Sequence, residues 1–356
     1  MIDAVTTASH DDQVIADLIC DGVDRWFGNS GDRVRQLHDM QRAAVNLVPT
    51  WLGALRMRAV PLDAASISEI DAAAHRQRTY RDLAGRLRAM WPRITVVKGE
   101  TIARHYPDGI PRYSNDLDLT VPDPATAFAV AAELDRQGWR PETLTVHEDA
   151  GRTEVLVVLS GPSENPLRRP YAVEVSSSGW VGNRMGVPSR HGWPGSSSDV
   201  STGMVALSAE RLERPFGLRD ILDCSLLLSV AQQSDIDAFV AAAEDVDIAP
   251  ESRELLLAVC DYARTPEPAR VVLARLDTRR ARRHRAARAA RVVRGPRWGL
   301  ARLAQHMFLF HGQRQHWNWL LSRLTDSVPG ATTTRHGLVA WGVAVVRGTG
   351  PIPDGS

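Results

Sequence analysis

Lysine is nearly absent from this sequence. Of its 43 basic residues, 42 are arginine and one is lysine, Lys98. The chain is also rich in alanine, and we attribute the shortage to a GC-rich coding background, which removes lysine wherever any cation will serve. If a position keeps lysine despite this background, we infer that a compact ammonium group serves a purpose there that the larger, planar guanidinium group of arginine does not. Lys98 is therefore the first candidate functional residue.

Cysteine and long apolar runs are scarce as well. The three cysteines, Cys20, Cys224 and Cys260, are far apart, which argues against a disulfide framework and against a clustered thiolate metal site. No apolar run reaches the length of a membrane span, and the first residues lack the basic and apolar blocks of a signal peptide. We expect a cytoplasmic protein with no membrane partner.

The remaining composition is that of an ordinary globular protein. The chain has 356 residues, of which 44% are hydrophobic and 24% charged, and its formal net charge is +1. These values exclude a disordered or collagen-like chain, and the length allows two or three domains. Apolar residues recur at helical spacing near the beginning of the chain and again in its last part. In the region between, apolar and polar residues alternate as they do in strands. We predict a helical region 1–94, a mixed core 95–200 and a helical region 201–356.

The middle region contains four predicted strands, ITVVKG, DLDLTV, TEVLVVLS and YAVEVSSS. Asp123 is predicted to cap a helix that has Pro124 in its first turn and ends at Gly138. A stretch rich in glycine and serine, residues 176–198, closes the region and is expected to form a mobile flap.

Two carboxylates on the second predicted strand are the main chemical signal. Side chains alternate along a strand, so Asp116 and Asp118 point to the same face and repel each other unless a cation lies between them. Mg²⁺ suits such oxygen ligands and keeps positions open for phosphates. Gly99 ends the preceding strand and begins a helix, whose free N–H groups can bind a phosphate. Together these features indicate a site for a metal-bound nucleoside triphosphate.

This order of features resembles a known enzyme signature. A glycine followed by a helix and an Asp-x-Asp strand resembles the nucleotidyltransferases of the DNA polymerase β superfamily. The wider string VVKGETIARHYPDGIPRYSNDLDLTV is similar to that of an uncharacterised bacterial nucleotidyltransferase family. RYSNDLDLTV and GLRDILDCSLLL also resemble motifs of the nucleotidyltransferase toxins of type IV abortive-infection systems.

The resemblance spans about residues 95–225 and implies an α+β fold. The fold would be a polymerase-β-like core, a small mixed sheet with flanking helices, between N- and C-terminal helical regions. Asp116 and Asp118 would hold Mg²⁺ together with a third catalytic carboxylate on a neighbouring strand. Glu174 is our candidate because a charge on so apolar a strand is costly unless it is used. Glu154 is the alternative.

The resemblance also implies a nucleotide-binding set, namely Lys98, Gly99, Glu100, Thr101 and Arg112. Lys98 and Arg112 would neutralise phosphate charge as it builds up in the transition state. For Arg112, a structural ion pair with Asp116 or Asp108 is an equally good interpretation. Glu100 stands where many superfamily members have glycine or serine, and it would repel phosphates unless it turns away or helps to hold metal.

The implied reaction is Mg²⁺-dependent transfer of a nucleoside monophosphate from a nucleoside triphosphate to an acceptor hydroxyl or phosphate, with release of pyrophosphate. The acceptor is a small molecule, a protein or an RNA. Two alternatives stay open. One is a degenerate nucleotidyltransferase fold that binds a nucleotide or a partner without catalysis, which Glu100 favours. The other is a tRNA-modifying toxin of a toxin–antitoxin pair.

Two further segments are candidates for other roles. Residues 275–302, from Arg275 to Arg302, contain eleven arginines and one acidic residue, so they form a handle for nucleic acid or an acidic partner, or else a solvated helix. In the helix that contains Arg219, the side chains of Asp220 and Asp223 share a face. We expect these two carboxylates to brace the site rather than to react.

Overall fold

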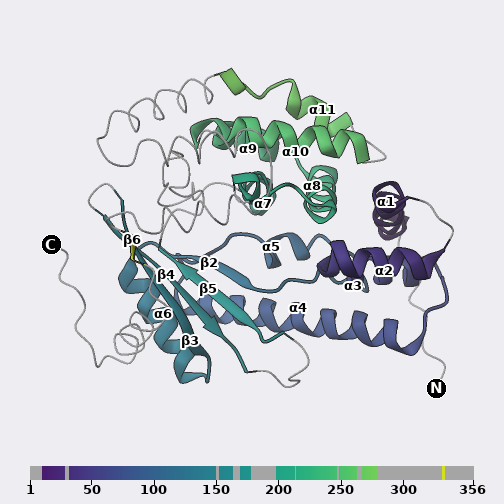
Figure 1. Cartoon of the computed structure of the whole chain (residues 1–356). Coiled ribbons are helices and arrows are strands. Elements are labelled where there is room, and N and C mark those ends of the chain that lie inside the picture. The colour runs from purple at the N-terminus through teal and green to yellow at the C-terminus, as the bar shows by residue number, and fades with distance from the viewer. Residues whose placement is uncertain are drawn as a thin grey trace.

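The computed structural model describes residues 10–28, 32–149, 152–162, 169–177, 198–212, 214–246, 248–262, 267–279 and 331–332. These residues form an α+β structure that is mostly helical and contains one mixed sheet (Figure 1). The predicted flap, apart from its first two residues and Ser198, lies outside the described residues. None of the described helices is long and apolar enough to cross a membrane.

The helices fall into an N-terminal group, two that lie in the sheet region of the chain, and a C-terminal group. The first group is α1 His10–Phe27, α2 Arg33–Ala43, the 3-10 turn η1 Val45–Leu47, α3 Val48–Met57 and α4 Ala64–Met90. The sheet region contains α5 Glu100–Ala103 and α6 Pro124–Arg136. The last group is α7 Asp199–Ala209, the 3-10 turn η3 Glu210–Leu212, α8 Leu218–Val230, α9 Gln233–Asp245, α10 Ala249–Tyr262 and α11 Glu267–Leu273.

The described strands form one sheet in the order β1-β2-β5-β4-β3-β6. Their bounds are β1 Thr95–Val96, β2 Leu117–Thr120, β3 Arg140–Asp149, β4 Arg152–Ser160, β5 Ala172–Ser176 and β6 Ala331–Thr332. Strands β2 and β5 are parallel, and the other neighbouring pairs are antiparallel. In the parallel pair, Asp118 lies opposite Glu174.

Alternation along β2 and β5 separates an apolar face of the sheet from a polar one. Leu117 and Leu119 of β2 and Val173 and Val175 of β5 are buried, and they pack in one core with α4 and α6. Figure 1 shows α4 and α6 together on that side of the sheet. Because side chains alternate, the residues between these four point to the opposite face. That face carries the candidate carboxylates.

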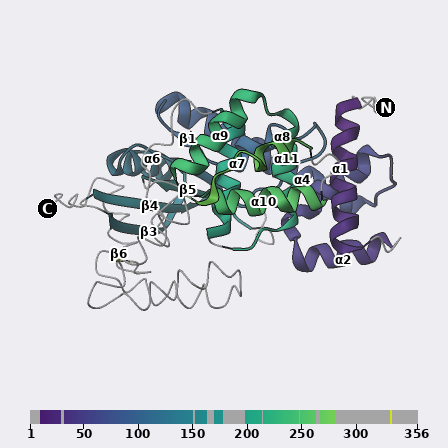
Figure 2. The ribbon, with the colours of Figure 1, turned by 90° about the horizontal axis from the view of Figure 1, so that it is seen from above.

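Two hydrophobic cores share the described residues, and α4 contributes to both. Ile70, near its N-terminus, belongs to the core of α1, α3 and α7–α11, whereas Tyr80 and Leu87 belong to the sheet core. The N- and C-terminal helical groups therefore share a single core, and they lie side by side in two views (Figures 1 and 2). The three predicted regions are not separate packing units.

The four predicted strands are present, and Asp123 caps α6 by accepting a hydrogen bond from the Thr126 amide at 2.7 Å. Three elements escaped prediction, and one of them is β6, a two-residue strand in the region 201–356 that we predicted to be helical. Strand β3 begins with arginine, proline and glutamate, a start that disfavours a strand assignment. Helix α3 is buried at every position from Val48 to Leu55, so it has no polar face and no helical alternation to detect.

Helix α3 approaches the loop that follows α5 very closely. A Cβ atom added at Gly53 would lie 2.7 Å from the carbonyl oxygen of Gly109 and 3.0 Å from Cα of Ile110. The hydroxyl of Thr50 donates a 2.7 Å hydrogen bond to the carbonyl of Pro111. Glycine at position 53 therefore lets the helix support the loop that leads to Arg112.

We expect Gly53→Ala to lower the free energy of unfolding by about 1–3 kcal/mol, because the added methyl group meets backbone atoms that cannot move aside. The gain of about 0.5–1 kcal/mol in helix propensity does not offset this clash. Denaturant unfolding measures the difference.

Gly85→Ala in the exposed middle of α4 is the matched control, since its new Cβ meets nothing within 4 Å. This change is expected to be neutral or stabilising. Equal effects of the two substitutions would contradict the proposed close approach.

Candidate functional site

The structure brings three predicted carboxylates together. Asp116 precedes β2, Asp118 lies within it, and Glu174 lies on β5 directly opposite Asp118. One carboxylate oxygen from each residue lies within 4.8 Å of the other two, and all three side chains are half-buried. The parallel register of β2 and β5 therefore forms the cluster that the sequence pattern predicted.

Electrostatics make this cluster unfavourable without a cation. Burial and the carboxylates of Asp116 and Glu174 raise the pKa of Asp118 to about 7, although Lys98 opposes the shift. A cation beside the cluster would favour the ionised form of all three groups. Three carboxylate donors are the oxygen ligands that Mg²⁺ prefers, so the residues fit the predicted metal.

The alternative third carboxylate lies elsewhere in the sheet. Val158 of β4 pairs with Glu174, and Glu154 lies four residues before Val158 on the same strand. At the rise of a strand this separation is about 13 Å. The side chain of Glu154 lies outside the described part of the chain. The backbone register favours Glu174 as the partner of Asp116 and Asp118.

Lys98 lies at the edge of the carboxylate cluster. Its Nζ is 3.6 Å from Oδ2 of Asp118 and forms an ion pair with Glu210 of η3. Burial alone would lower the pKa of Lys98, but the charges of Asp118 and Glu210 outweigh burial and raise it. The ammonium group is thus charged, and it links the strand to the C-terminal helical group.

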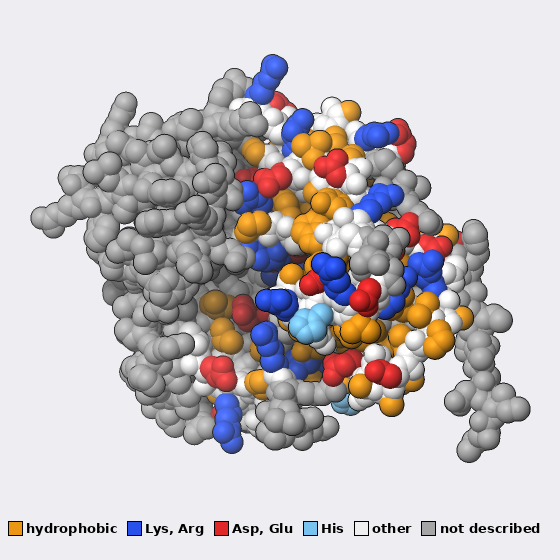
Figure 3. Space-filling view, turned by 45° about the vertical axis from the view of Figure 1, so that its right-hand side comes forward, with side chains coloured by type: hydrophobic (Ala, Val, Ile, Leu, Met, Phe, Trp, Pro, Cys, Tyr) orange, Lys and Arg blue, Asp and Glu red, His pale blue; other side chains and the backbone are white. Residues whose placement is uncertain are grey.

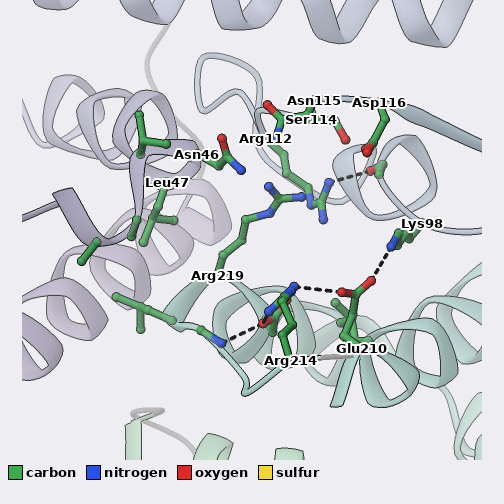
Figure 4. A pocket seen from close by; sticks show the side chains of 18 of the residues that line it. Asn46, Leu47, Lys98, Arg112, Ser114, Asn115, Asp116, Glu210, Arg214 and Arg219 are labelled. Carbon is green, nitrogen blue, oxygen red and sulfur yellow. Dashed lines mark hydrogen bonds and ion pairs between the residues drawn. The ribbon is translucent and has the colours of Figure 1, made fainter. Parts of the chain in front are cut away.

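A cavity of about 420 Å³ opens beside Lys98 and the two aspartates. Its wall includes Gly99 from the sheet region, Asn46 from the N-terminal group and Glu210 from the C-terminal group. Figure 4 shows Lys98 and Arg214 approaching Glu210 from opposite sides, with Asp116 above Lys98. This volume lies within the usual range of about 300–1,000 Å³ for ligand pockets.

The three predicted residues at the start of α5 have different environments. Gly99 lines the cavity at φ 66°, a left-handed conformation that favours glycine. Glu100 is outside the cavity lining, and its Oε1 accepts a 2.7 Å hydrogen bond from Arg81 of α4. Thr101 is fully buried and donates to the carbonyl of Val96. Glu100 therefore turns away from the cavity, and the Thr101 hydroxyl is already used.

Arg112 is buried in an ion pair that the sequence did not indicate. It pairs with Asp223 of α8 instead of Asp108 or Asp116, and three of its contacts to that carboxylate measure 2.7–3.0 Å. The Tyr106 hydroxyl donates a 2.6 Å hydrogen bond to the same carboxylate. The third nitrogen of Arg112 donates to the carbonyl of Gly99 at 3.2 Å. Arg112 thus braces the glycine turn from behind while one side of its guanidinium lines the cavity.

Arg219 is a cavity residue whose role the sequence did not reveal. Figure 4 shows its guanidinium beside that of Arg112, and its Nε lies 3.8 Å from Oδ2 of Asp223. Burial and the charge of Arg112 lower the pKa of Arg219. Asp220, by contrast, pairs with Arg214 at 2.6 Å and caps α8 through the Gly217 amide. The bracing role expected for Asp220 and Asp223 agrees with these contacts.

Other wall residues also escaped the sequence analysis. They come from four separate segments: Trp26, Asn46, Ser114, Asn115, Glu210 and Arg214. Only the fold brings them together. Ser114 and Asn115 lie in the RYSNDLDLTV string that carries the resemblance, directly before Asp116, and this was the available signal for them.

Most of the arginine-rich segment lies outside the described residues, because the described range in this part of the chain ends at Arg279. Within them, Arg275 pairs with Asp237 of α9 at 2.7 Å. On the described part of the face in Figure 3, basic and acidic side chains intermingle with hydrophobic ones. A binding role for residues 275–302 stays a prediction.

No protein-family model, curated protein or solved structure matches this chain. Its function is therefore inferred from the geometry of the site and from the motifs in its sequence.

The buried pair of Arg112 and Asp223 yields a stability prediction. Asp223→Ala leaves a charged guanidinium buried without its carboxylate, so we expect the free energy of unfolding to fall by about 3–5 kcal/mol. Denaturant unfolding monitored by circular dichroism measures the loss.

Glu254→Ala is the control because Glu254 pairs with Arg211 at 2.6 Å but is 53% exposed. It is expected to cost at most about 1 kcal/mol. A loss that small for Asp223→Ala as well would refute the bracing role.

Proposed function

We propose that this protein is a Mg²⁺-dependent nucleotidyltransferase with a polymerase-β-like core. The observation that carries the proposal is the convergence of Asp116, Asp118 and Glu174 in one cluster, of which the two aspartates line a cavity beside Lys98. A mixed sheet with flanking helices, and a glycine turn that leads into a short helix, agree with the resemblance seen in the motifs.

In the proposed reaction, the oxygen of an acceptor hydroxyl forms a bond to the α-phosphorus of a nucleoside triphosphate. The bond from that phosphorus to the oxygen bridging to the β-phosphate breaks, and its electron pair leaves with pyrophosphate. Glu174, on the strand beside Asp118, would accept the hydroxyl proton and pass it to solvent. Mg²⁺ held by the three carboxylates would neutralise phosphate charge. An acceptor phosphate would react in the same way through its oxygen.

Cations of the cavity support binding of the phosphates. Lys98 shares its single charge between Asp118 and Glu210, and a flexible ammonium can move from a carboxylate to a phosphate oxygen. Arg219 is held beside another guanidinium, a repulsion that a bound phosphate would relieve. Trp26, 36% exposed, is the one aromatic residue among the described residues of the wall and offers a ring for a base to stack on.

The position of Glu100 bears on the catalytically degenerate alternative. Its pairing with Arg81 takes the carboxylate away from the phosphate side, so the residue that favoured a non-catalytic fold does not obstruct the cavity. The toxin alternative draws on the arginine-rich segment, most of which lies outside the described residues. We therefore favour a catalytic protein over a non-catalytic binding protein, and the toxin role stays a prediction.

The direct test supplies each of the four common nucleoside triphosphates, labelled at the α-phosphate, with Mg²⁺. Metabolite, protein and RNA fractions of a cell extract serve as separate acceptor sources. We expect one fraction to gain label as pyrophosphate forms, and Asp116→Ala with Asp118→Ala to abolish both. Retained turnover in the double variant would refute the assignment of these aspartates.

Lys98→Arg preserves charge but replaces a point charge with a bulky fork. We expect it to reduce turnover roughly tenfold or more, because the guanidinium cannot follow the departing pyrophosphate in the same space. Steady-state rates of pyrophosphate release measure the effect. The reverse exchange Arg81→Lys, outside the cavity, should leave the rate unchanged. Wild-type activity in Lys98→Arg would show that the reaction does not need an ammonium group at position 98.

Arg219→Gln removes one of the three guanidinium groups of the cavity lining, the one that lies beside Arg112. We expect it to weaken binding of a Mg²⁺–triphosphate complex about tenfold, the loss of one charge-assisted contact. Isothermal titration gives the dissociation constants, and Arg136→Gln, whose side chain is 72% exposed and outside the cavity lining, is the control. Unchanged binding in Arg219→Gln would exclude a phosphate contact at this residue.

A further inference from the structure

A second cavity, of about 860 Å³, lies between α2, α3 and α4. It shares Val45, Asn46 and Asn115 with the cavity that contains Lys98 and the aspartates. Asn115 directly precedes Asp116 in the chain. The two cavities therefore adjoin at Asn115, next to the carboxylate cluster, which is where a nucleotide acceptor has to reach the α-phosphorus.

The wall between the cavities contains an unsatisfied polar atom. The side-chain oxygen of Asn115 is buried and has no hydrogen-bond partner among the described residues. Its backbone carbonyl, by contrast, accepts hydrogen bonds from Tyr80 at 2.8 Å and Arg76 at 3.3 Å. A buried acceptor without a donor is costly, so this oxygen is suited to a ligand that donates a hydrogen bond, such as a hydroxyl group.

Aromatic rings form the side of the second cavity nearest Asn115. Arg76 is 7% exposed, and its guanidinium carbon lies 4.6 Å from the ring centre of Tyr171 and 5.4 Å from that of Tyr113. Its guanidinium also donates to three backbone carbonyls, those of Asn115, Arg169 and Pro170. Arg76 is therefore held as part of the wall, which fixes both rings in place.

The rest of the lining indicates what the cavity would accept. Apolar side chains of α3 and the preceding turn, including Val48 and Leu52, form the opposite wall. Asp63, which precedes α4, and Glu69 of α4 line the cavity together with His75, Arg76 and Arg169. The lining is therefore mixed in charge and is not a field of free cations that would favour a phosphodiester chain. Its aromatic and apolar wall suits a molecule with a ring or hydrocarbon part, and ring faces and carboxylates favour a neutral or cationic one.

We propose that this second cavity binds the acceptor of the nucleotidyl transfer, an uncharged or cationic small molecule with an apolar or aromatic part and a hydroxyl group. The acceptor role rests on the proposed function. The hydroxyl passes Asn115 to reach Asp116 and Asp118, and its oxygen forms the new bond to the α-phosphorus. The bond from that phosphorus to the bridging oxygen breaks, pyrophosphate leaves with the electron pair, and the hydroxyl proton passes to Glu174.

Three compounds with the same phenol ring and different charge test this proposal: neutral tyrosol, cationic tyramine and anionic 4-hydroxyphenylacetate. Their binding to the full chain is measured by ligand-observed NMR. We expect tyrosol and tyramine to bind at least about tenfold more tightly than the anion. Failure of both to bind, or equal binding of the anion, would overturn the assigned ligand class.

Ala72→Trp locates the binding, because Ala72 of α4 lines the cavity and the indole would fill it. Ala74→Trp is the matched control, since Ala74 is equally half-buried on α4 but outside this lining. We expect Ala72→Trp and the smaller change Asn115→Ala each to weaken tyrosol binding about tenfold, and Ala74→Trp to leave it unchanged. No effect of Ala72→Trp and Asn115→Ala would overturn the site.

Titration of the same proteins with a Mg²⁺–triphosphate complex separates the two proposals. If the wild type binds triphosphate and neither tyrosol nor tyramine, the second-cavity proposal fails alone. If it binds no triphosphate, the proposed function fails, and the acceptor role fails with it. Binding of a short oligoribonucleotide that Ala72→Trp abolishes would overturn the small-molecule assignment in favour of RNA.

Discussion

The parallel pairing of β2 with β5 is the constraint on which the candidate site depends. It places Glu174 opposite Asp118 and leaves three carboxylates on one face of the sheet, while α4 and α6 cover the other face. Like charges this close are held together only because the apolar residues between them are anchored in the core. The packing of the sheet therefore supports an arrangement that the side chains themselves oppose, and a divalent cation would remove the opposition.

A second layer of contacts fixes the rest of the site to this strand pair. Arg112 joins the glycine turn to Asp223 of the helical core, and Lys98 joins β1 to Glu210. Both links cross from the sheet core to the helical core. The cavity that contains Lys98 and the aspartates lies at this junction, so its shape depends on how the two cores are held together. This explains why wall residues come from segments far apart in the chain.

The sequence was most informative where local geometry alone decides the outcome. Two-residue alternation placed Asp116 and Asp118 on one face, and a lone charge on an apolar strand pointed to Glu174. The rarity of lysine singled out Lys98. Partners far apart in sequence were beyond this reasoning: Asp223 is 111 residues from Arg112, whereas the carboxylates considered for Arg112 were those nearest in the chain. Helix α3 and strand β3 were missed because one lacks a polar face and the other begins with residues that disfavour strands.

The central claim is that the three carboxylates hold a divalent cation together with a triphosphate. Mn²⁺ takes the same oxygen ligands as Mg²⁺ and is visible by electron paramagnetic resonance, so its binding can be titrated with a non-hydrolysable triphosphate present. We predict that the wild type binds Mn²⁺ more tightly than the nucleotide alone does, that Asp118→Asn loses this binding, and that Glu100→Gln retains it. Binding no tighter than to free nucleotide, or equal loss in both variants, would contradict the account.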